Sequence, residues 1–227
     1  MNNPTLVNPK QAAGECAAEL VKDGMIIGLG TGSTTAFAIQ ALGRRVAGGL
    51  AILGIPTSYQ SAFLAAECKI PLTTLDEHPV VDIDIDGADQ VANFIGIKGG
   101  GAAHTREKIV AMSSKRFVVV VDESKCVNVL NYPVPLEVLP FARQLVIKQV
   151  AELGGSARIR MGVNKDGPVI SDNGNLIMDA DFGAIDDPVS LGEILSQCTG
   201  IVEHGIFTNV STVYIGKKDG SVEIMET

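Results

Sequence analysis

The sequence of 227 residues contains no tryptophan, and aromatic residues make up only 4% of it. A hydrophobic core must therefore be built from aliphatic side chains, which are plentiful, because hydrophobic residues make up 46% of the chain. Only 19% of the residues are charged. This balance excludes a disordered chain, which combines few aliphatic residues with a high net charge. The length allows one large domain or two small ones.

Positive charge is scarce as well. The 18 lysine and arginine residues are outnumbered by 26 aspartate and glutamate residues, which gives a formal net charge of −8. No stretch of the chain is rich in lysine or arginine. The field of the whole chain would repel a polyanion such as DNA, so we expect no nucleic-acid partner. A small phosphate-bearing molecule is still compatible with the sequence, because a few local cations can override the overall field.

The sequence also lacks long apolar runs and paired cysteines. The densest apolar run, Phe117–Val121, is far shorter than the ~20 residues that span a bilayer. The first ten residues contain no apolar core of signal-peptide length. The cysteines at Cys16, Cys68, Cys126 and Cys198 form no C-x-x-C pair, so we expect buried free thiols rather than disulfides or zinc ligands. The sequence thus predicts a cytoplasmic protein without a membrane partner.

Helical and strand patterns alternate over the first half of the chain. Helices are expected over 11–21, 34–42, 58–67 and 102–113, and strands over 25–30, 50–55, 80–86 and 117–121. Such alternation predicts an α/β fold, with an open, mostly parallel sheet and helices on both of its faces (Rossmann-like).

The pattern changes at residues 132–140, where three prolines fall within nine residues and a domain junction is expected. Beyond it we expect a helix over 142–153, a strand over 157–163, a hairpin around Asn173-Gly174 and a helix over 188–198. This order is typical of a small α+β domain of the split βαβ, ferredoxin-like kind. The predicted domains are therefore a larger α/β domain, 1–130 with 204–227, and a smaller α+β domain, 131–203.

The first candidate site is the loop Gly28-Leu-Gly-Thr-Gly-Ser-Thr34, which follows a predicted strand and opens a helix. Backbone N–H groups at a helix N-terminus attract an anion, and glycine lets the anion approach closely. The loop lacks the lysine of a Walker motif, and Ser33 stands where a dinucleotide fingerprint has its third glycine. We interpret the loop as a phosphate site; the alternative is an ordinary tight turn with a Ser/Thr cap.

The second candidate site is the acidic segment that ends the strand predicted over 80–86. Its pattern Asp82-x-Asp84-x-Asp86 imitates the start of a calcium loop, but Asn93 occupies the position of the essential glutamate, so we reject calcium. Strand alternation predicts that Asp82 and Asp84 lie on a solvated face. Asp86 and Asp89 follow the carboxyl end of the strand, which is where ligands bind in open α/β sheets.

Two further candidate sites also follow strands. Lys98 precedes three consecutive glycines that form a second anion-binding nest before a helix, and Glu107 lies early in that helix. Taken alone, Glu107 is more simply a surface carboxylate paired with a neighbouring cation, and His104 is expected to be a helix-start residue rather than a catalyst. Lys125 follows the strand over 117–121, and a solvated lysine is the default there.

Because all four groups follow strand ends, they are expected to converge on one pocket. Two anion nests, lysines and carboxylates fit a phosphorylated sugar better than a nucleotide. In order and spacing, the motifs resemble the type A ribose-5-phosphate isomerase family from about Lys10 to the C-terminus. The motifs that carry this resemblance are Gly-Thr-Gly-Ser-Thr34, Asp86-Gly-Ala-Asp89, Lys98-Gly-Gly-Gly101 with Ala-Ala-His-Thr-Arg-Glu107-Lys, and Asp-Glu-Ser-Lys125. Gln90 departs from the usual Glu of the family, and His104 from the common apolar residue.

The resemblance implies an enzyme that interconverts D-ribose 5-phosphate and D-ribulose 5-phosphate in the pentose phosphate pathway. It implies no cofactor and no metal, a site held by the larger domain, and a homodimer or homotetramer. Carried over to this chain, the implied substrate-binding residues are Lys10, Thr31, Gly32, Ser33, Thr34, Asp86, Gly87, Ala88, Asp89, Lys98, Gly99, Gly100, Gly101 and Lys125.

The implied catalytic residues are Glu107, Asp86, Asp89 and Lys98. Glu107 would move a proton between C2 and C1 through an enediolate, and burial is expected to raise its pKa. Nearby cations would oppose that rise, so the lysines are expected to lie nearer the substrate oxygens or phosphate than the base. Lys98 or the N–H groups of the nest would meet the enediolate charge. Asp86 or Asp89 would help to open the sugar ring, with Asp89 the preferred candidate.

Two other classes of function remain as alternatives. A sugar-phosphate-binding regulatory protein with a similar α/β domain would need a helix-turn-helix segment, and the residues before the first predicted helix leave no room for one. A nicotinamide-dependent dehydrogenase would need an acidic residue near position 52 to hold the ribose, yet residues 43–55 contain no Asp or Glu.

Overall fold

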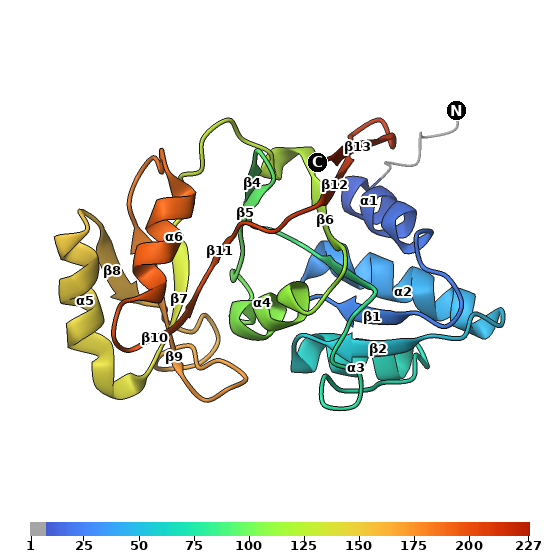
Figure 1. Ribbon diagram of the computed structural model, residues 1–227, viewed down its shortest axis with the longest axis horizontal. Coiled ribbons are helices and arrows are strands. Elements are labelled where there is room, and N and C mark those ends of the chain that lie inside the picture. The colour runs from blue at the N-terminus through green and yellow to red at the C-terminus, as the bar shows by residue number, and fades with distance from the viewer. Residues whose placement is uncertain (1–7) are drawn as a thin grey trace. The chain divides into compact units, whose positions relative to one another are not determined.

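The computed structural model describes residues 8–227, which form two compact units (Figure 1). The first unit consists of an N-terminal segment that ends at Gly87, together with Val110–Cys126 and Val210–Thr227. The second unit consists of Ala88–Ile109 and Val127–Asn209. The domains expected from the sequence, 1–130 with 204–227 and 131–203, are segments that would fold independently. Those boundaries stay a prediction. Most of the first ten residues, in which no signal peptide is expected, lie outside the described residues.

The first unit is built on a six-stranded sheet, which confirms the expected open, mostly parallel architecture. The strand order is β13-β12-β6-β3-β1-β2, and only β13 runs antiparallel to its neighbour. The strands are β1 (Ile26–Leu29), β2 (Leu53–Pro56), β3 (Ile83–Asp86), β6 (Phe117–Asp122), β12 (Thr212–Gly216) and β13 (Val222–Glu226).

Helices cover both faces of this sheet. The helices are α1 (Pro9–Ala18), α2 (Ser33–Ala47), α3 (Tyr59–Glu67) and the end of α4 (His104–Met112), whose residues before Val110 belong to the second unit. A short 3-10 helix, η1 (Glu123–Lys125), follows β6. Ile27 joins an aliphatic cluster with residues of α1, α2 and α3, whereas its neighbour Ile26 packs with Val110 of α4. Because successive side chains of a strand point to opposite faces, these two clusters mark the two covered faces.

The second unit contains a four-stranded antiparallel sheet of order β10-β7-β9-β8. Its chain order is β7 (Val134–Val138), α5 (Arg143–Glu152), β8 (Ser156–Ile159), β9 (Leu176–Asp181), α6 (Pro188–Ser196) and β10 (Ile201–His204), with η2 (Pro140–Ala142) before α5. This is the expected split βαβ order. A small sheet joins β4 (Gln90–Ala92), β5 (Ile95–Ile97) and β11 (Ile206–Phe207). The predicted hairpin at Asn173-Gly174 is confirmed by the antiparallel bridge of Ile170 with Leu176 and by the N–H of Ser171, which donates to the carbonyl of Asn175 over 2.9 Å.

The proline-rich stretch 132–140 differs from expectation, because it holds the central strand β7 rather than only a junction. Proline removes one hydrogen-bond donor and is disfavoured in a central strand. Here the carbonyl of Pro135 accepts from the N–H of Gly205, just beyond the last β10 pair, His204 with Leu136. The N–H and the C=O of one strand residue point to the same side of the strand. The N–H that Pro135 lacks would therefore point to the side of β10, at a position where β10 has already ended.

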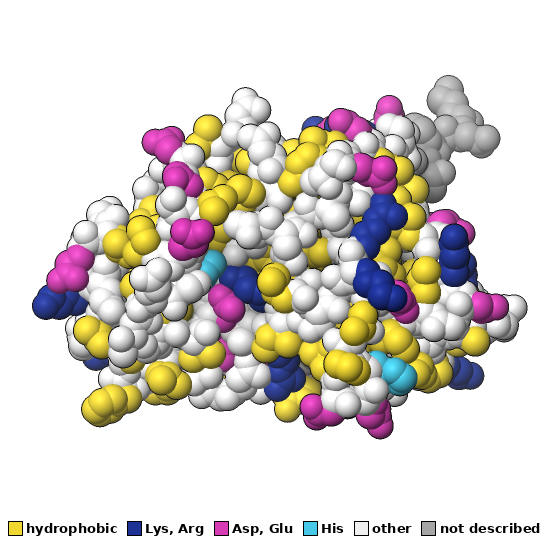
Figure 2. Space-filling model, viewed as in Figure 1, with side chains coloured by type: hydrophobic (Ala, Val, Ile, Leu, Met, Phe, Trp, Pro, Cys, Tyr) yellow, Lys and Arg dark blue, Asp and Glu magenta, His cyan; other side chains and the backbone are white. Residues whose placement is uncertain are grey.

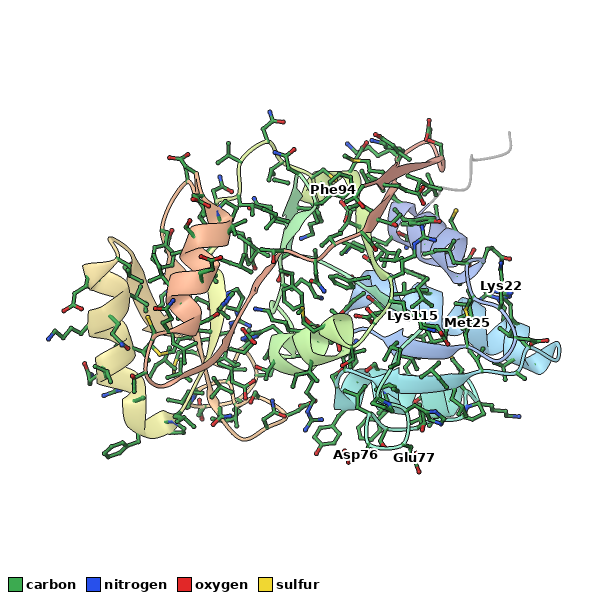
Figure 3. All side chains as sticks on the ribbon, viewed as in Figure 1. Lys22, Met25, Asp76, Glu77, Phe94 and Lys115 are labelled. Atoms are coloured by element: carbon green, nitrogen blue, oxygen red, sulfur yellow. The ribbon has the colours of Figure 1, made fainter. Side chains whose placement is uncertain are left out.

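The prediction of a solvated acidic face on β3 was wrong. Asp84 is fully buried, because helices cover both faces of a central strand in a parallel sheet. A Cβ added at Gly28 of the adjacent strand would lie 2.3 Å from an Asp84 carboxylate oxygen, so glycine makes the room for this carboxylate. Asp82 precedes the strand, and its Oδ1 lies 2.7 Å from Nζ of Lys115 (labelled in Figure 3).

Several expectations about chemistry outside the site can be compared with residues 8–227. None of the helices in this range is long and apolar enough to cross a membrane. All four cysteines are free, although each is half-buried rather than buried. On the face shown in Figure 2, Lys and Arg side chains lie among acidic ones.

Candidate active site

The loop between β1 and α2 brings together several of the predicted phosphate-binding residues. Gly32 is the N-cap of α2 with a φ of 118°, a value that favours glycine, and Ser33 begins the helix. The Nζ of Lys10 donates to Ser33 Oγ over 3.1 Å. A helix N-terminus and an ammonium group therefore meet at the side chain of Ser33, which is the arrangement that a phosphate requires.

Asp86 holds this loop in place. Its side chain is fully buried at the end of β3, and Oδ1 accepts from the N–H of Thr31 at 2.9 Å and of Gly87 at 2.7 Å. A Cβ at Gly30 would lie 2.2 Å from the Asp86 carboxyl carbon, so this close approach depends on glycine.

Lys125 lies in η1, directly after β6. Burial would raise the pKa of the nearby Asp122 carboxyl, but hydrogen bonds from Ser124 and the charges of Lys10 and Lys125 hold it below its usual range. Two of the predicted substrate-binding lysines therefore act on the same carboxylate within the first unit.

The second unit holds the glycine segment Gly99–Gly101, which we call the glycine nest. Gly99 has a φ of 110°, and a Cβ added there would lie 2.7 Å from His104 Nδ1. The N–H of Gly100 donates to Asp89 Oδ2 over 2.7 Å. A Cβ at Gly100 would lie only 2.4 Å from the other oxygen of Asp89, so glycine lets this predicted carboxylate lie against the nest.

Lys98 and Glu107 form a buried ion pair. The Lys98 Nζ lies 3.0 Å from Glu107 Oε2, and the two side chains are 2% and 4% exposed. The expectation that the lysines would lie away from the base was therefore wrong for Lys98. The physical reason is that two charges removed from water stabilise each other, whereas either one alone would be costly to bury. The Lys98 ammonium also lies 5.2 Å from the centre of the Phe207 ring.

The surface interpretation of Glu107 is also wrong, because the flanking cations have other partners. Arg106 donates to Asn173 and to the backbone of residue 172, and Lys108 pairs with Glu203 at 2.7 Å. His104 begins α4, as expected, and is fully buried. Burial lowers the pKa of His104 to about 4, so its ring is neutral near pH 7.

Glu137 is a buried carboxylate that sequence reasoning missed. It accepts hydrogen bonds from Thr105 Oγ1, from Ser171 Oγ at 2.9 Å and from Asn175 Nδ2 at 2.7 Å. Burial would raise the pKa of Glu137, but these donors lower it. The carboxylate anchors the first turn of α4, two residues before Glu107. Its partners lie more than 30 positions away in the chain, so no local pattern signals it.

Metal-ligand geometry can be assessed for the described part of the chain. Within residues 8–227, no group of three or more His, Cys, Asp or Glu side chains could hold a metal ion. The predicted site residues fall into two sets. Lys10, the β1–α2 loop, Asp86, Gly87 and Lys125 belong to the first unit, and Ala88, Asp89, Lys98, the glycine nest and Glu107 belong to the second.

Comparison with known proteins gives one consistent answer. The family model of ribose 5-phosphate isomerase A (phosphoriboisomerase A) matches residues 53–220. Ribose-5-phosphate isomerase A of Methanosarcina acetivorans is 58% identical over 99% of this chain and 97% of its own, and that of Haloarcula marismortui is 54% identical over 93% and 92%.

Solved structures agree with the sequence comparisons. Ribose 5-phosphate isomerase A of Methanocaldococcus jannaschii superposes with a TM-score of 0.92 at 48% identity, covering 96% of this chain and 98% of the other. A D-ribose-5-phosphate isomerase in complex with phospho-erythronic acid gives a TM-score of 0.93 at 44% identity, with the same coverage. The chain therefore belongs to the ribose 5-phosphate isomerase A family.

Proposed function

We propose that Glu107 is the base by which this protein interconverts D-ribose 5-phosphate and D-ribulose 5-phosphate, and that the reaction passes through an enediolate. Membership of the family supports the isomerase activity. Phospho-erythronic acid, bound by one solved relative, is a phosphorylated sugar acid, which supports a phosphorylated sugar as the substrate. The observation that carries the mechanism is the buried ion pair of Glu107 and Lys98, 3.0 Å apart.

The ion pair suits a proton transfer between adjacent carbons. The Lys98 ammonium stabilises the carboxylate form of Glu107, which is the form that accepts a proton. When Glu107 takes the C2 proton it becomes neutral, and the negative charge passes to the enediolate oxygens. Lys98 then stabilises that charge, so a cation stays paired throughout the step. Return of the proton to C1, with transfer of the hydroxyl proton from O2 to O1, completes the ketose.

We assign ring opening to Asp89 rather than Asp86. Asp86 is fully buried, and its Oδ1 already accepts two backbone N–H groups of the β1–α2 loop and its own turn. Asp89 is half-buried, and the N–H of Gly100 donates to its Oδ2. A carboxylate that is partly accessible can exchange a proton with a sugar hydroxyl, whereas Asp86 is suited to holding the phosphate loop.

We assign the phosphate of the substrate to the N-terminus of α2. Ser33 and Thr34 would donate to it through their hydroxyls and N–H groups, and Lys10 and Lys125 would neutralise its charge. The Lys10–Ser33 contact at 3.1 Å supports this assignment.

The finer expectations of a homodimer or homotetramer in the cytoplasm belong to the same proposal. Light scattering of the purified protein tests the oligomer, and a single monomeric mass would contradict it. Cell fractionation tests the location, and activity confined to a non-cytoplasmic fraction would contradict it.

The decisive experiment is a direct assay of ribulose 5-phosphate formation from ribose 5-phosphate, with EDTA present. Turnover that depends on the phosphate, with unphosphorylated ribose as the control substrate, is the expected result. Absence of turnover by folded protein would refute the proposed function.

A further inference from the structure

We propose that Arg160 is a positioning residue that fixes the direction of the glycine nest, and this proposal rests on the function proposed above. Arg160 directly follows β8 in the second unit. Its backbone N–H donates to Ile177 over 2.9 Å, and its carbonyl accepts from Val169 over 2.8 Å. The base of the side chain is therefore held on both sides.

The guanidinium group is fixed at two places. On one side, Nη1 donates to the carbonyl of Gly99 at 2.8 Å and to that of Gly100 at 3.0 Å. On the other side, Nε donates to Asp179 Oδ2 at 3.0 Å, and Nη2 donates to Asp179 Oδ1. Because guanidinium is a rigid planar fork, the two-point contact with Asp179 determines where Nη1 points.

This contact sets the orientation of two peptide groups in the nest. Both peptides are trans, and in a trans peptide the C=O and the N–H point in opposite directions. With both carbonyls directed at Arg160, the N–H groups of Gly100 and Gly101 point away from it. The Gly100 N–H donates to Asp89, and we infer that the Gly101 N–H is the donor presented to the enediolate oxygen.

The N–H of Ala102 donates to the carbonyl of Gly99 over 3.0 Å and closes the turn. Glycine has the greatest backbone freedom of any residue, so this single bond leaves the direction of the peptides between the two residues adjustable. A misplacement of about 1 Å in a group that contacts the reacting atoms can cost ~10²-fold in rate. The cation at the carbonyl oxygens also polarises both peptides and strengthens their N–H groups as donors. Arg160 therefore acts through the nest rather than on the substrate.

The alternative is that Arg160 and Asp179 form a cross-strand ion pair that stabilises the fold only. The test is the Arg160→Ala variant, with kcat and KM measured on ribose 5-phosphate in the presence and absence of added guanidinium. We expect kcat to fall ~10–100-fold with a much smaller change in KM, since the nest acts on charge that develops in the transition state. Millimolar guanidinium is expected to restore part of kcat, and sodium chloride at equal ionic strength is expected not to.

Chemical rescue separates the two interpretations, because guanidinium destabilises folded proteins and cannot raise activity by refolding the variant. A surface pocket of about 250 Å³, lined by Gly100, Tyr132, Pro133, Arg158, Arg160 and Asp179, gives the ion access. Arg158→Ala is the matched control, because Arg158 is exposed and lines the same pocket but, among the described residues, donates no hydrogen bond to the nest. It is expected to stay within about twofold of the wild-type kcat, as surface substitutions usually do.

Hydrogen exchange supplies a readout that does not depend on activity. Amide protons of residues 99–101 are expected to exchange faster in Arg160→Ala than in Arg158→Ala. If Arg160→Ala does not fold, Asp179→Asn takes its place, because it keeps Arg160 but weakens its anchor. A folded variant with wild-type kcat and wild-type exchange in the nest would overturn the proposal, as would loss of kcat without any rescue. A wild-type protein without isomerase activity would instead refute the proposed function, whatever the exchange result.

Discussion

Replacement of Glu107 by Gln tests the assignment of the base. Gln keeps the shape of the side chain but cannot accept the C2 proton, and loss of a general base costs ~10²–10⁴-fold in rate. That corresponds to about 3–5 kcal/mol of transition-state stabilisation. Substrate binding is expected to be nearly intact, so the loss should appear in kcat.

The same substitution has a cost in stability that follows from the buried contact with Lys98. Removal of one partner from a buried ion pair costs ~3–5 kcal/mol, because the other charge is left uncompensated. The Gln amide oxygen can still accept a hydrogen bond from the ammonium, and a bond to a charged group contributes ~1.5–3 kcal/mol. The expected net loss in the free energy of unfolding therefore lies between about 0 and 3.5 kcal/mol, with a middle value of ~2 kcal/mol by the same two estimates.

Steady-state kinetics on ribose 5-phosphate and urea denaturation measure the two effects separately. The double variant Lys98→Met with Glu107→Gln is the matched control, because it removes both buried charges and is expected to be more stable than Glu107→Gln alone. Turnover by Glu107→Gln within threefold of the wild type would show that the base lies elsewhere, with Asp86 or Asp89 the next candidates. A double variant less stable than the single one would refute the account of the ion pair.

Three further predictions concern the phosphate, metal and pH. Ser33→Ala should weaken substrate binding by only ~1.5–3 kcal/mol, because the backbone donors remain. Gly32→Val should lower kcat/KM more for ribose 5-phosphate than for unphosphorylated ribose. Equal losses for both sugars would show that the loop does not bind phosphate. Activity should survive EDTA, because Lys98 and backbone donors can meet the enediolate charge, and loss of activity that magnesium or calcium restores would contradict this. Protonation of His104 should lower the free energy of unfolding by about 2 kcal/mol between pH 7 and pH 5. The ring takes a proton near pH 6.5 in the unfolded chain but only near pH 4 in the folded protein, where it is buried. The unfolded state therefore binds more protons in this pH range, and stability is lost as the pH falls. Urea denaturation of His104→Gln should lack this part of the pH dependence, and an unchanged slope would show that His104 is not responsible.

Local sequence patterns predicted the strand, turn and helix start of the β1–α2 loop because the determinants of these elements are local. Glycines at positions 28, 30 and 32, between an apolar run and a helix, specify a strand, a tight turn and a helix N-terminus. The burial of Asp84 could not be predicted by alternation alone, since alternation presumes one solvated face. Gly28 on the neighbouring strand was the available signal, because its missing side chain leaves room for a carboxylate.

Other features depend on contacts between distant residues. Residues 132–140 were interpreted as a junction, although they contain β7. Pro135 disfavours a central strand, and a single sequence does not show where the adjacent strand ends. The contacts of Arg160 with the nest join segments some 60 positions apart. Such pairs become evident only when the chain is folded.

The interrupted course of the first unit has a consequence for synthesis on the ribosome. Strand β6 pairs with β12, which lies more than 90 positions later in the chain. At ~5–20 residues per second the emerging chain waits about 5–18 s for that partner. During this time the second unit, which ends at Asn209, can be completed first, while the apolar strand Phe117–Val121 presents an unpaired edge that invites aggregation. If folding follows synthesis, the second unit is therefore completed before the six-stranded sheet, whose strands precede and follow it in the chain. A chaperone that shields β6 should raise the yield of native protein.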